Sequence, residues 1–229
     1  MTSNKSKRLL VEGRDDMHSV IHLMADHIQP RPNREEAWPV DIKDCNGIDG
    51  ILNATIVGAE LKASDLKILG VIIDADADPN ARWASFRSIY RRHFPEIPEA
   101  LPPGGLITEN DRDIRLGFWL MPDCSSSGML ETFLKDLVRD SAKPLWDHAV
   151  ASFEQARSLN APCDPAHSDK ARVHTWLAWQ EPPGQTFGIA LRSRTLDPKS
   201  PAAAAFVTWF KHLSPLRTSP HALPHPRHR

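Results

Sequence analysis

The sequence has few cysteines, a single tyrosine, no long apolar run and almost no net charge. Its three cysteines are widely spaced and form no C-x-x-C pair, which argues against both a disulfide framework and a thiolate zinc site. Lysine and arginine number 28 against 29 aspartates and glutamates, so the formal net charge of -1 gives no overall attraction to a polyanion. A nucleic-acid partner would have to be attracted by local basic patches or by bound cations.

The apolar runs are too short to cross a bilayer. The run at 68–73 is continuously apolar, but a membrane-spanning helix needs about 20 such residues. The first residues, MTSNKSKR, lack the apolar stretch of an export signal. We therefore expect a cytoplasmic protein that does not contact a membrane.

The first half of the chain alternates short apolar runs with segments of helical periodicity. The expected strands are 9–11, 38–45 and 68–73, and the expected helices are 15–28, about 48–57 and 81–94. Two further apolar runs, 105–108 and 114–121, flank a polar turn and predict a hairpin. This alternation predicts an α/β fold with a mostly parallel sheet flanked by helices, and a ligand site outside the carboxyl ends of its strands.

The second half is helical in pattern. Expected helices cover 128–138, 145–159, 168–179 and 202–213, and the segment from 214 onward is rich in Pro, His and Arg with little to bury. With 229 residues the chain can bury one sizeable core. We therefore expect an α/β core at 1–138, a helical extension at 139–213 packed on that core, and a disordered tail at 214–229.

The first acidic motif, LVEGRDD at 10–16, lies where the first expected strand ends. Glu12 is placed at the strand tip, Gly13 permits a sharp turn, and Asp16 enters the first turn of the next helix. These acids can be read as site residues, or as ordinary helix N-terminal acids that the helix dipole favours. The motif alone leaves both readings open.

The second acidic motif follows the most apolar expected strand. Asp74, Asp76 and Asp78 alternate along the chain, so their carboxylates project from one side if the backbone stays extended. A calcium loop of the EF-hand type is a poor alternative, because it requires Gly at its sixth position and Glu at its twelfth, where this chain has Pro79 and Ser85.

A sheet of this kind would bring the two motifs together. Two carboxylates 4 Å apart repel each other by about 4 kcal/mol at an effective dielectric constant of about 20. Either some of them bind protons, or a hard divalent cation neutralises them. Magnesium, or manganese in its place, suits oxygen ligands and can bridge to substrate phosphates.

The two motifs at this spacing, E-G-x-x-D after a first strand and D-x-D after a later apolar strand, resemble the signature of the Toprim (topoisomerase-primase) domain. The layout is similar to small stand-alone bacterial Toprim proteins related to nucleases of the overcoming-lysogenization-defect family. The resemblance implies an acid/base role for Glu12 and Mg²⁺ binding by Asp74 and Asp76. Asp16 corresponds to the additional acid of the nuclease-like branch.

Two downstream residues are further candidates. Glu131 opens the helix after the hairpin and could reach the pocket, where nuclease-like members use another acid and a second metal ion; Asp123 is a weaker candidate for that duty. Lys170 opens a later helix, and the related nucleases place a lysine downstream of their last acid. The alternatives are a solvent-facing helix acid and a solvated surface lysine.

The resemblance leads to two functional hypotheses. The first is a Mg²⁺- or Mn²⁺-dependent nuclease that cuts DNA or RNA, in phage defence or a stress response. The second is a non-catalytic Toprim module that holds metal and nucleotide and acts through a partner protein such as an ATPase. A topoisomerase or primase is less expected, because Tyr90 lies in an expected helix and the cysteines lack zinc-module spacing. The oligomeric state is left open.

Overall fold

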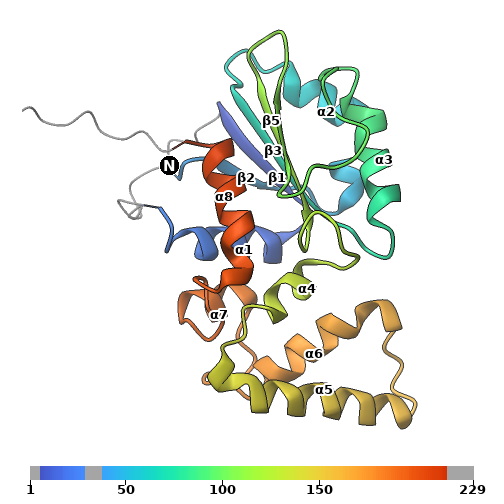
Figure 1. Cartoon of the computed structure of the whole chain (residues 1–229), viewed down its shortest axis with the longest axis vertical. Helices are drawn as coiled ribbons and strands as arrows, with labels where there is room; N and C mark the ends of the chain where they lie inside the picture. The colour runs from blue at the N-terminus through green and yellow to red at the C-terminus, as the bar shows by residue number, and fades with distance from the viewer. Residues whose placement is uncertain (1–5, 29–37, 216–229) are drawn as a thin grey trace, which may run out of the picture.

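The computed structural model describes residues 6–28 and 38–215 and shows an α/β protein (Figure 1). Its five-stranded sheet has the order β2-β1-β3-β5-β4, in which β4 runs antiparallel to β5 and the other neighbours are parallel. The strands are β1 (Lys7–Val11), β2 (Asp41–Asp44), β3 (Ile68–Asp74), β4 (Leu106–Glu109) and β5 (Arg115–Met121). The expected fold class, including the hairpin and the C-terminal helical region, is confirmed.

Eight α-helices and four short 3₁₀ helices occur in the described part of the chain. The α-helices are α1 (Arg14–Met24), α2 (Ala54–Leu61), α3 (Pro79–Tyr90), α4 (Leu130–Lys135), α5 (Lys143–Ser158), α6 (Ser168–Leu177), α7 (Phe187–Arg192) and α8 (Ala204–Leu213). The 3₁₀ helices are η1 (Ile48–Gly50), η2 (Asp140–Ala142), η3 (Pro165–His167) and η4 (Pro201–Ala203). Within residues 6–28 and 38–215, no helix combines the length and apolar character that a membrane crossing needs.

Some helices differ from the expected ones. The helix expected at about 48–57 divides into η1 and α2, because the side chain of Asn53 caps α2 by accepting hydrogen bonds from the amides of Thr55 and Ile56. Helix α4 is shorter than the expected 128–138, and α7 was not predicted at all. Helix α7 has six residues, which are too few to show a helical period in the sequence.

The connections between strands place helices on both faces of the sheet. The step from β1 to β2 and the step from β2 to β3 run in opposite directions across the sheet, so right-handed crossovers put α1 and α2 on opposite faces. Helix α3 lies with α2, and α8 covers the other face together with α1 (Figure 1). The chain therefore leaves β1 and β3, which are neighbours, toward opposite faces, and this opens a crevice at their carboxyl ends.

Aromatic residues of β5 fill both interfaces between sheet and helices. Phe118 packs on Phe86 of α3 with ring centroids 4.0 Å apart. The next residue, Trp119, points to the other face and contacts Phe206 of α8 at 5.3 Å. Both faces of the sheet are therefore buried, as the continuously apolar β3 requires.

Helix α8 approaches the sheet closely because two glycines face it. Gly70 of β3 and Gly117 of β5 are paired in register. A Cβ atom added at either would lie 2.8 Å or 2.6 Å, respectively, from a methyl carbon of Leu213. The last helix of the expected extension thus packs directly on the strands of the expected core. Ser214, where the predicted tail begins, is buried, and the tail from 216 lies outside the described residues.

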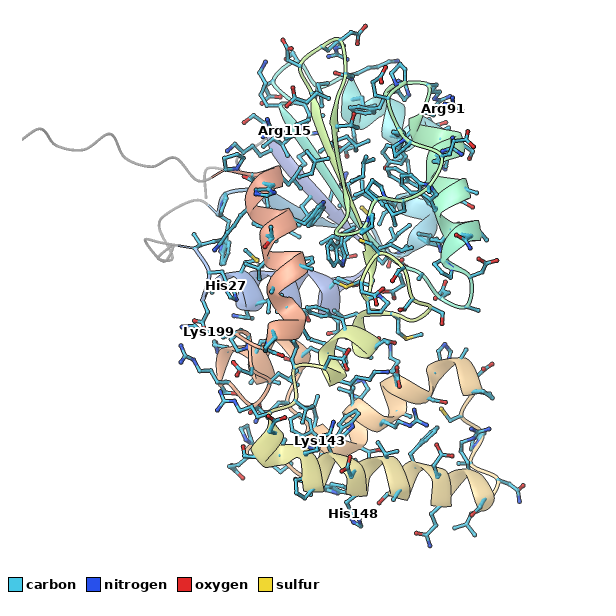
Figure 2. All side chains as sticks on the ribbon, viewed as in Figure 1. His27, Arg91, Arg115, Lys143, His148 and Lys199 are labelled. Atoms are coloured by element: carbon cyan, nitrogen blue, oxygen red, sulfur yellow. The ribbon has the colours of Figure 1, made fainter. Side chains whose placement is uncertain are left out.

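Helices α5 and α6 form a hairpin beside the rest of the molecule (Figure 1). Trp146 and Trp176 meet edge to face between them, at 6.3 Å. His148, labelled in Figure 2, stacks on the partly exposed Trp179. Helix α6 also contacts α4, which follows β5, and this contact brings the hairpin to the carboxyl end of the sheet.

Candidate functional site

The first contact of the site joins the tips of β1 and β3. Glu12 follows the last residue of β1, and Asp74 is the last residue of β3. Oε1 of Glu12 accepts a hydrogen bond from the backbone amide of Asp74, with the two atoms 2.9 Å apart. The two acidic motifs, 62 residues apart in the chain, therefore meet in the crevice between the neighbouring strands.

The loop before α4 completes this corner. Oδ1 of Asp74 accepts a hydrogen bond of 2.9 Å from the amide of Leu130. Asp76 and Gly128 exchange two backbone hydrogen bonds, of 2.8 and 2.7 Å. Gly128 has φ +137°, and a Cβ atom there would lie 2.5 Å from Oγ1 of Thr132. The sequence predicted a helix from 128, whereas the structure places Gly128 in the loop before α4.

Asp16 serves as a helix cap and also belongs to the site. Its Oδ2 accepts a hydrogen bond of 3.0 Å from the amide of Gly13, at the start of α1. This is the structural role that the sequence left open. The charges of Glu12 and Glu131 also act on the same carboxylate.

Four carboxylates are called here the acidic cluster, Glu12, Asp16, Asp74 and Glu131, because the charges of Glu12 and Glu131 act on both Asp16 and Asp74. Burial, together with the charges of Glu12 and Glu131, raises the pKa of Asp16 to about 7. Burial and the charges of Asp16, Glu12 and Glu131 raise the pKa of Asp74 well above its usual range. The pKa of Glu12 is also raised, chiefly by burial, against the hydrogen bond from Asp74. The partly buried surroundings of the acidic cluster therefore disfavour the ionised form of these three carboxyls.

Glu131 and Lys170 form an ion pair at the edge of the acidic cluster. The side chain of Glu131 is only 5 % exposed, so it is not a solvent-facing helix acid. Nζ of Lys170 lies 3.1 Å from Oε1 of Glu131, and the lysine side chain is half exposed. Burial lowers the pKa of Lys170, but the charges of Glu131, Asp15 and Asp74 outweigh this and raise it overall.

Asp76 lies beside the acidic cluster, where its charge raises the pKa of Glu12. Its φ of +52° shows that the backbone does not stay extended through the second motif, so the expected one-sided row of carboxylates is wrong at this residue. The side chain is 54 % exposed and forms an ion pair with Arg82 of α3. Asp78 caps α3 by accepting hydrogen bonds from two backbone amides. Asp123 likewise uses its oxygens locally, on Ser125 and Ser126.

The acidic cluster is not closed into a ligand sphere. Across the described ranges, no group of three or more His, Cys, Asp or Glu side chains is arranged so that it could hold a metal ion as it stands. The chemistry of the donors nevertheless fits a hard divalent cation, because all four offer carboxylate oxygens. The raised pKa values of Glu12, Asp16 and Asp74 also indicate that added positive charge would stabilise their ionised forms.

Comparison with known proteins places the chain in one family. Neither the curated proteins nor the solved structures contain a match to it. A family model described as "Protein of unknown function (DUF3226)" matches residues 6–215, which covers the sheet, the acidic cluster and all the helices described above. The chain therefore belongs to the DUF3226 family.

Proposed function

We propose that this protein is a Toprim-like nuclease that uses Mg²⁺ or Mn²⁺ to cut nucleic-acid phosphodiesters, in phage defence or a stress response. The hydrogen bond between Glu12 and the amide of Asp74 carries this proposal, because it joins two acidic motifs at the switch point of an α/β sheet. The raised pKa values of three carboxyls add that the acidic cluster needs positive charge. Functional sites commonly hold groups perturbed in this way.

Each residue of the acidic cluster has a role in this proposal. Asp16, Asp74 and Glu12 would hold the cation, with Asp76 and Glu131 beside them. A bound divalent ion would neutralise charge on a phosphodiester and lower the pKa of a water molecule. Glu12, whose pKa is raised, is suited to exchange a proton with the attacking or leaving oxygen. The ammonium group of Lys170 would stabilise the negative charge that develops on the phosphate.

A second candidate function is favoured by the ion pairs. Arg82 and Lys170 already neutralise Asp76 and Glu131. With two of the five acids satisfied by the protein itself, the site can instead retain metal and nucleotide without cleavage. The protein would then act through a partner such as an ATPase.

A cleavage assay separates the two functions. The parent chain is incubated with labelled single- and double-stranded DNA and RNA, with Mg²⁺ or Mn²⁺. The variants are Glu12→Gln, Asp74→Asn, and Asp111→Asn as a control in the exposed β4–β5 turn. We expect cleavage by the parent and the control, and a loss of about 10²–10⁴-fold in Glu12→Gln, the range for a general acid or base.

Two other results would speak against the nuclease. If Glu12→Gln and Asp74→Asn cleave as fast as the parent, the acidic cluster does not carry the activity. If the parent binds Mn²⁺ and cuts none of the substrates, the non-catalytic function is supported. Asn retains an oxygen that can accept the hydrogen bond from Leu130, so Asp74→Asn tests the charge and not the local fold.

A further inference from the structure

Helices α4 and α6 are joined by two ion pairs of opposite polarity. Glu131 of α4 pairs with Lys170 of α6 at 3.1 Å. Lys135 of α4 pairs with Asp169 of α6 at 2.8 Å. Asp169 and Lys170 are adjacent in the first turn of α6, so both pairs join the same turn to α4.

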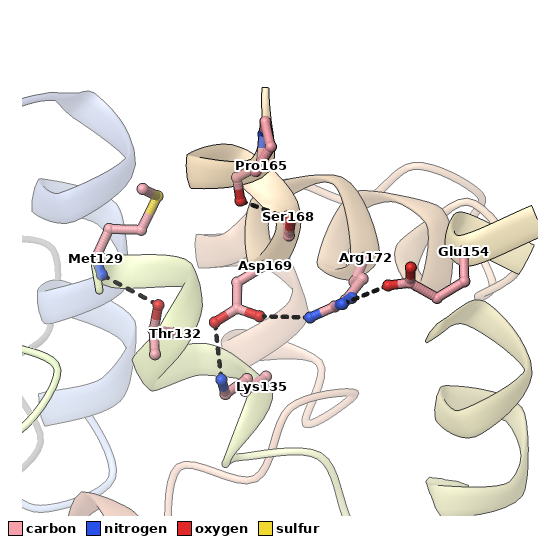
Figure 3. A network of polar contacts seen from close by, with 8 residues as sticks. All are labelled: Met129, Thr132, Lys135, Glu154, Pro165, Ser168, Asp169 and Arg172. Carbon is pink, nitrogen blue, oxygen red and sulfur yellow. Dashed lines mark hydrogen bonds and ion pairs between the residues drawn. The ribbon is translucent and has the colours of Figure 1, made fainter. Parts of the chain in front are cut away.

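Asp169 is the centre of a polar network that joins three helices (Figure 3). Its Oδ2 accepts a hydrogen bond from Lys135, and its Oδ1 lies 3.3 Å from Nη1 of Arg172. Nη2 of the same arginine donates a hydrogen bond of 2.6 Å to Glu154 of α5. Burial works against the charge of Asp169, but these partners and the side chain of Thr132 hold its pKa below the usual value. Asp169 therefore stays ionised and fixes α6 against both α4 and α5.

We propose that Lys170 is the built-in counter-cation of Glu131, that Asp169 is the positioning residue that keeps it there, and that the acidic cluster consequently takes one divalent cation. That cation would be held by Glu12, Asp16 and Asp74. The inference rests on the metal binding of the proposed function and decides between the one-ion and two-ion sites. It does not depend on whether the protein cleaves nucleic acid.

The charges and the burial support a single ion. Glu131 is nearly inaccessible, and Oε1 of its carboxylate already has an ammonium donor. A second divalent ion at Glu131 would have to displace this ammonium group or lie beside it, and two cations at this separation repel each other. Removing the charge of Lys170 would favour a second divalent ion at Glu131, because it leaves that buried carboxylate without a counter-ion.

The experiment counts bound Mn²⁺ ions by calorimetric titration and by the electron paramagnetic resonance signal of free Mn²⁺. We expect one ion per chain for the parent, two for Lys170→Gln, and one for the double variant K170Q/E131Q, which has lost both charges. Asp169→Asn should admit a second ion more weakly than Lys170→Gln, since the ammonium group is released but not removed. Lys199→Gln, at an exposed lysine that Figure 2 shows well away from α6, should still bind one.

Several results would overturn the inference. These are two ions in the parent, one ion in Lys170→Gln, or two ions retained in K170Q/E131Q. If Lys170→Gln does not fold, Glu131→Gln replaces it in the count of bound Mn²⁺. The single-ion site predicts one ion per chain in both the parent and Glu131→Gln. A second ion at Glu131 predicts two ions in the parent and one in Glu131→Gln. A parent that binds one ion and cuts nothing refutes the nuclease but leaves this inference standing. A parent that cuts nucleic acid with two bound ions supports the nuclease and refutes the single-ion site. A parent that binds no ion refutes the nuclease and the single-ion site together.

Discussion

The substitution Asp16→Asn tests whether burial and the neighbouring carboxylates destabilise the charged form of Asp16 in the absence of metal. In the unfolded chain Asp16 ionises near pH 3.8, whereas in the folded protein it keeps its proton until about pH 7. Between these values the folded state binds the extra proton, so the free energy of unfolding falls as the pH rises from about 4 to 7. A shift of about 3 pKa units corresponds to about 4 kcal/mol.

Asparagine removes this charge while its side-chain oxygen can still accept the hydrogen bond from the amide of Gly13. We therefore expect Asp16→Asn to be more stable than the parent by about 4 kcal/mol at pH 8, with the difference disappearing near pH 4. Urea unfolding in the presence of a chelator, followed by far-ultraviolet circular dichroism at several pH values, measures it. Asp15→Asn, at an exposed acid in the same turn, is the control and should change the stability little.

Added Mg²⁺ should reverse the order of stability. The parent gains stability because the ion binds only the folded state, and the variant, which lacks one carboxylate, gains less. The reasoning is refuted if Asp16→Asn and the parent have the same pH dependence without metal. An equal response of the two proteins to Mg²⁺ would contradict the assignment of Asp16 to the ion.

Two substitutions test the packing that supports the site. Gly128→Ala should lose about 1–3 kcal/mol of stability through backbone strain, and more if Thr132 cannot move away from the new Cβ. Gly184→Ala is the control, because Gly184 also has a positive φ but has open space around it, so only the backbone strain changes there. Leu213→Ala should lose about 2–5 kcal/mol in urea unfolding, because it leaves a cavity against the sheet. The exposed Leu159→Ala is its control, and equal losses at both leucines would show that α8 does not hold the sheet.

The sequence predicted the sheet well because each strand carried a local signal. The run at 68–73 is continuously apolar, and the structure buries it as the central β3. The strand expected at 38–45 shortens to β2, an edge strand with partly exposed residues, which gives a weaker pattern. The contact of Leu213 with the two glycines of β3 and β5 could not be predicted, because it joins residues that are distant in the chain and share no local pattern.

The acidic site was predictable to the extent that it depends on strand ends. Glu12, Asp16 and Asp74 were recognised because they follow apolar runs, and neighbouring strands bring them together. Their number and spacing did not reveal that Asp76 pairs with Arg82, because the motif was expected to stay extended and the positive φ of Asp76 has no local sequence signal. The pairing of Glu131 with Lys170 depends on the packing of α4 against α6, for which the sequence has no local signal.

The charge of Asp16 has no structural benefit that a neutral side chain could not provide. Its cap on α1 requires only an oxygen that accepts a hydrogen bond from Gly13, and asparagine offers one. Its ionisation is opposed by burial and by the charges of Glu12 and Glu131. A protein that only needed to fold would be more stable without this charge, and local features that oppose stability are most often found where a ligand binds. The partner that would make the charge favourable is a cation bound between the tips of β1 and β3, as the proposed function requires.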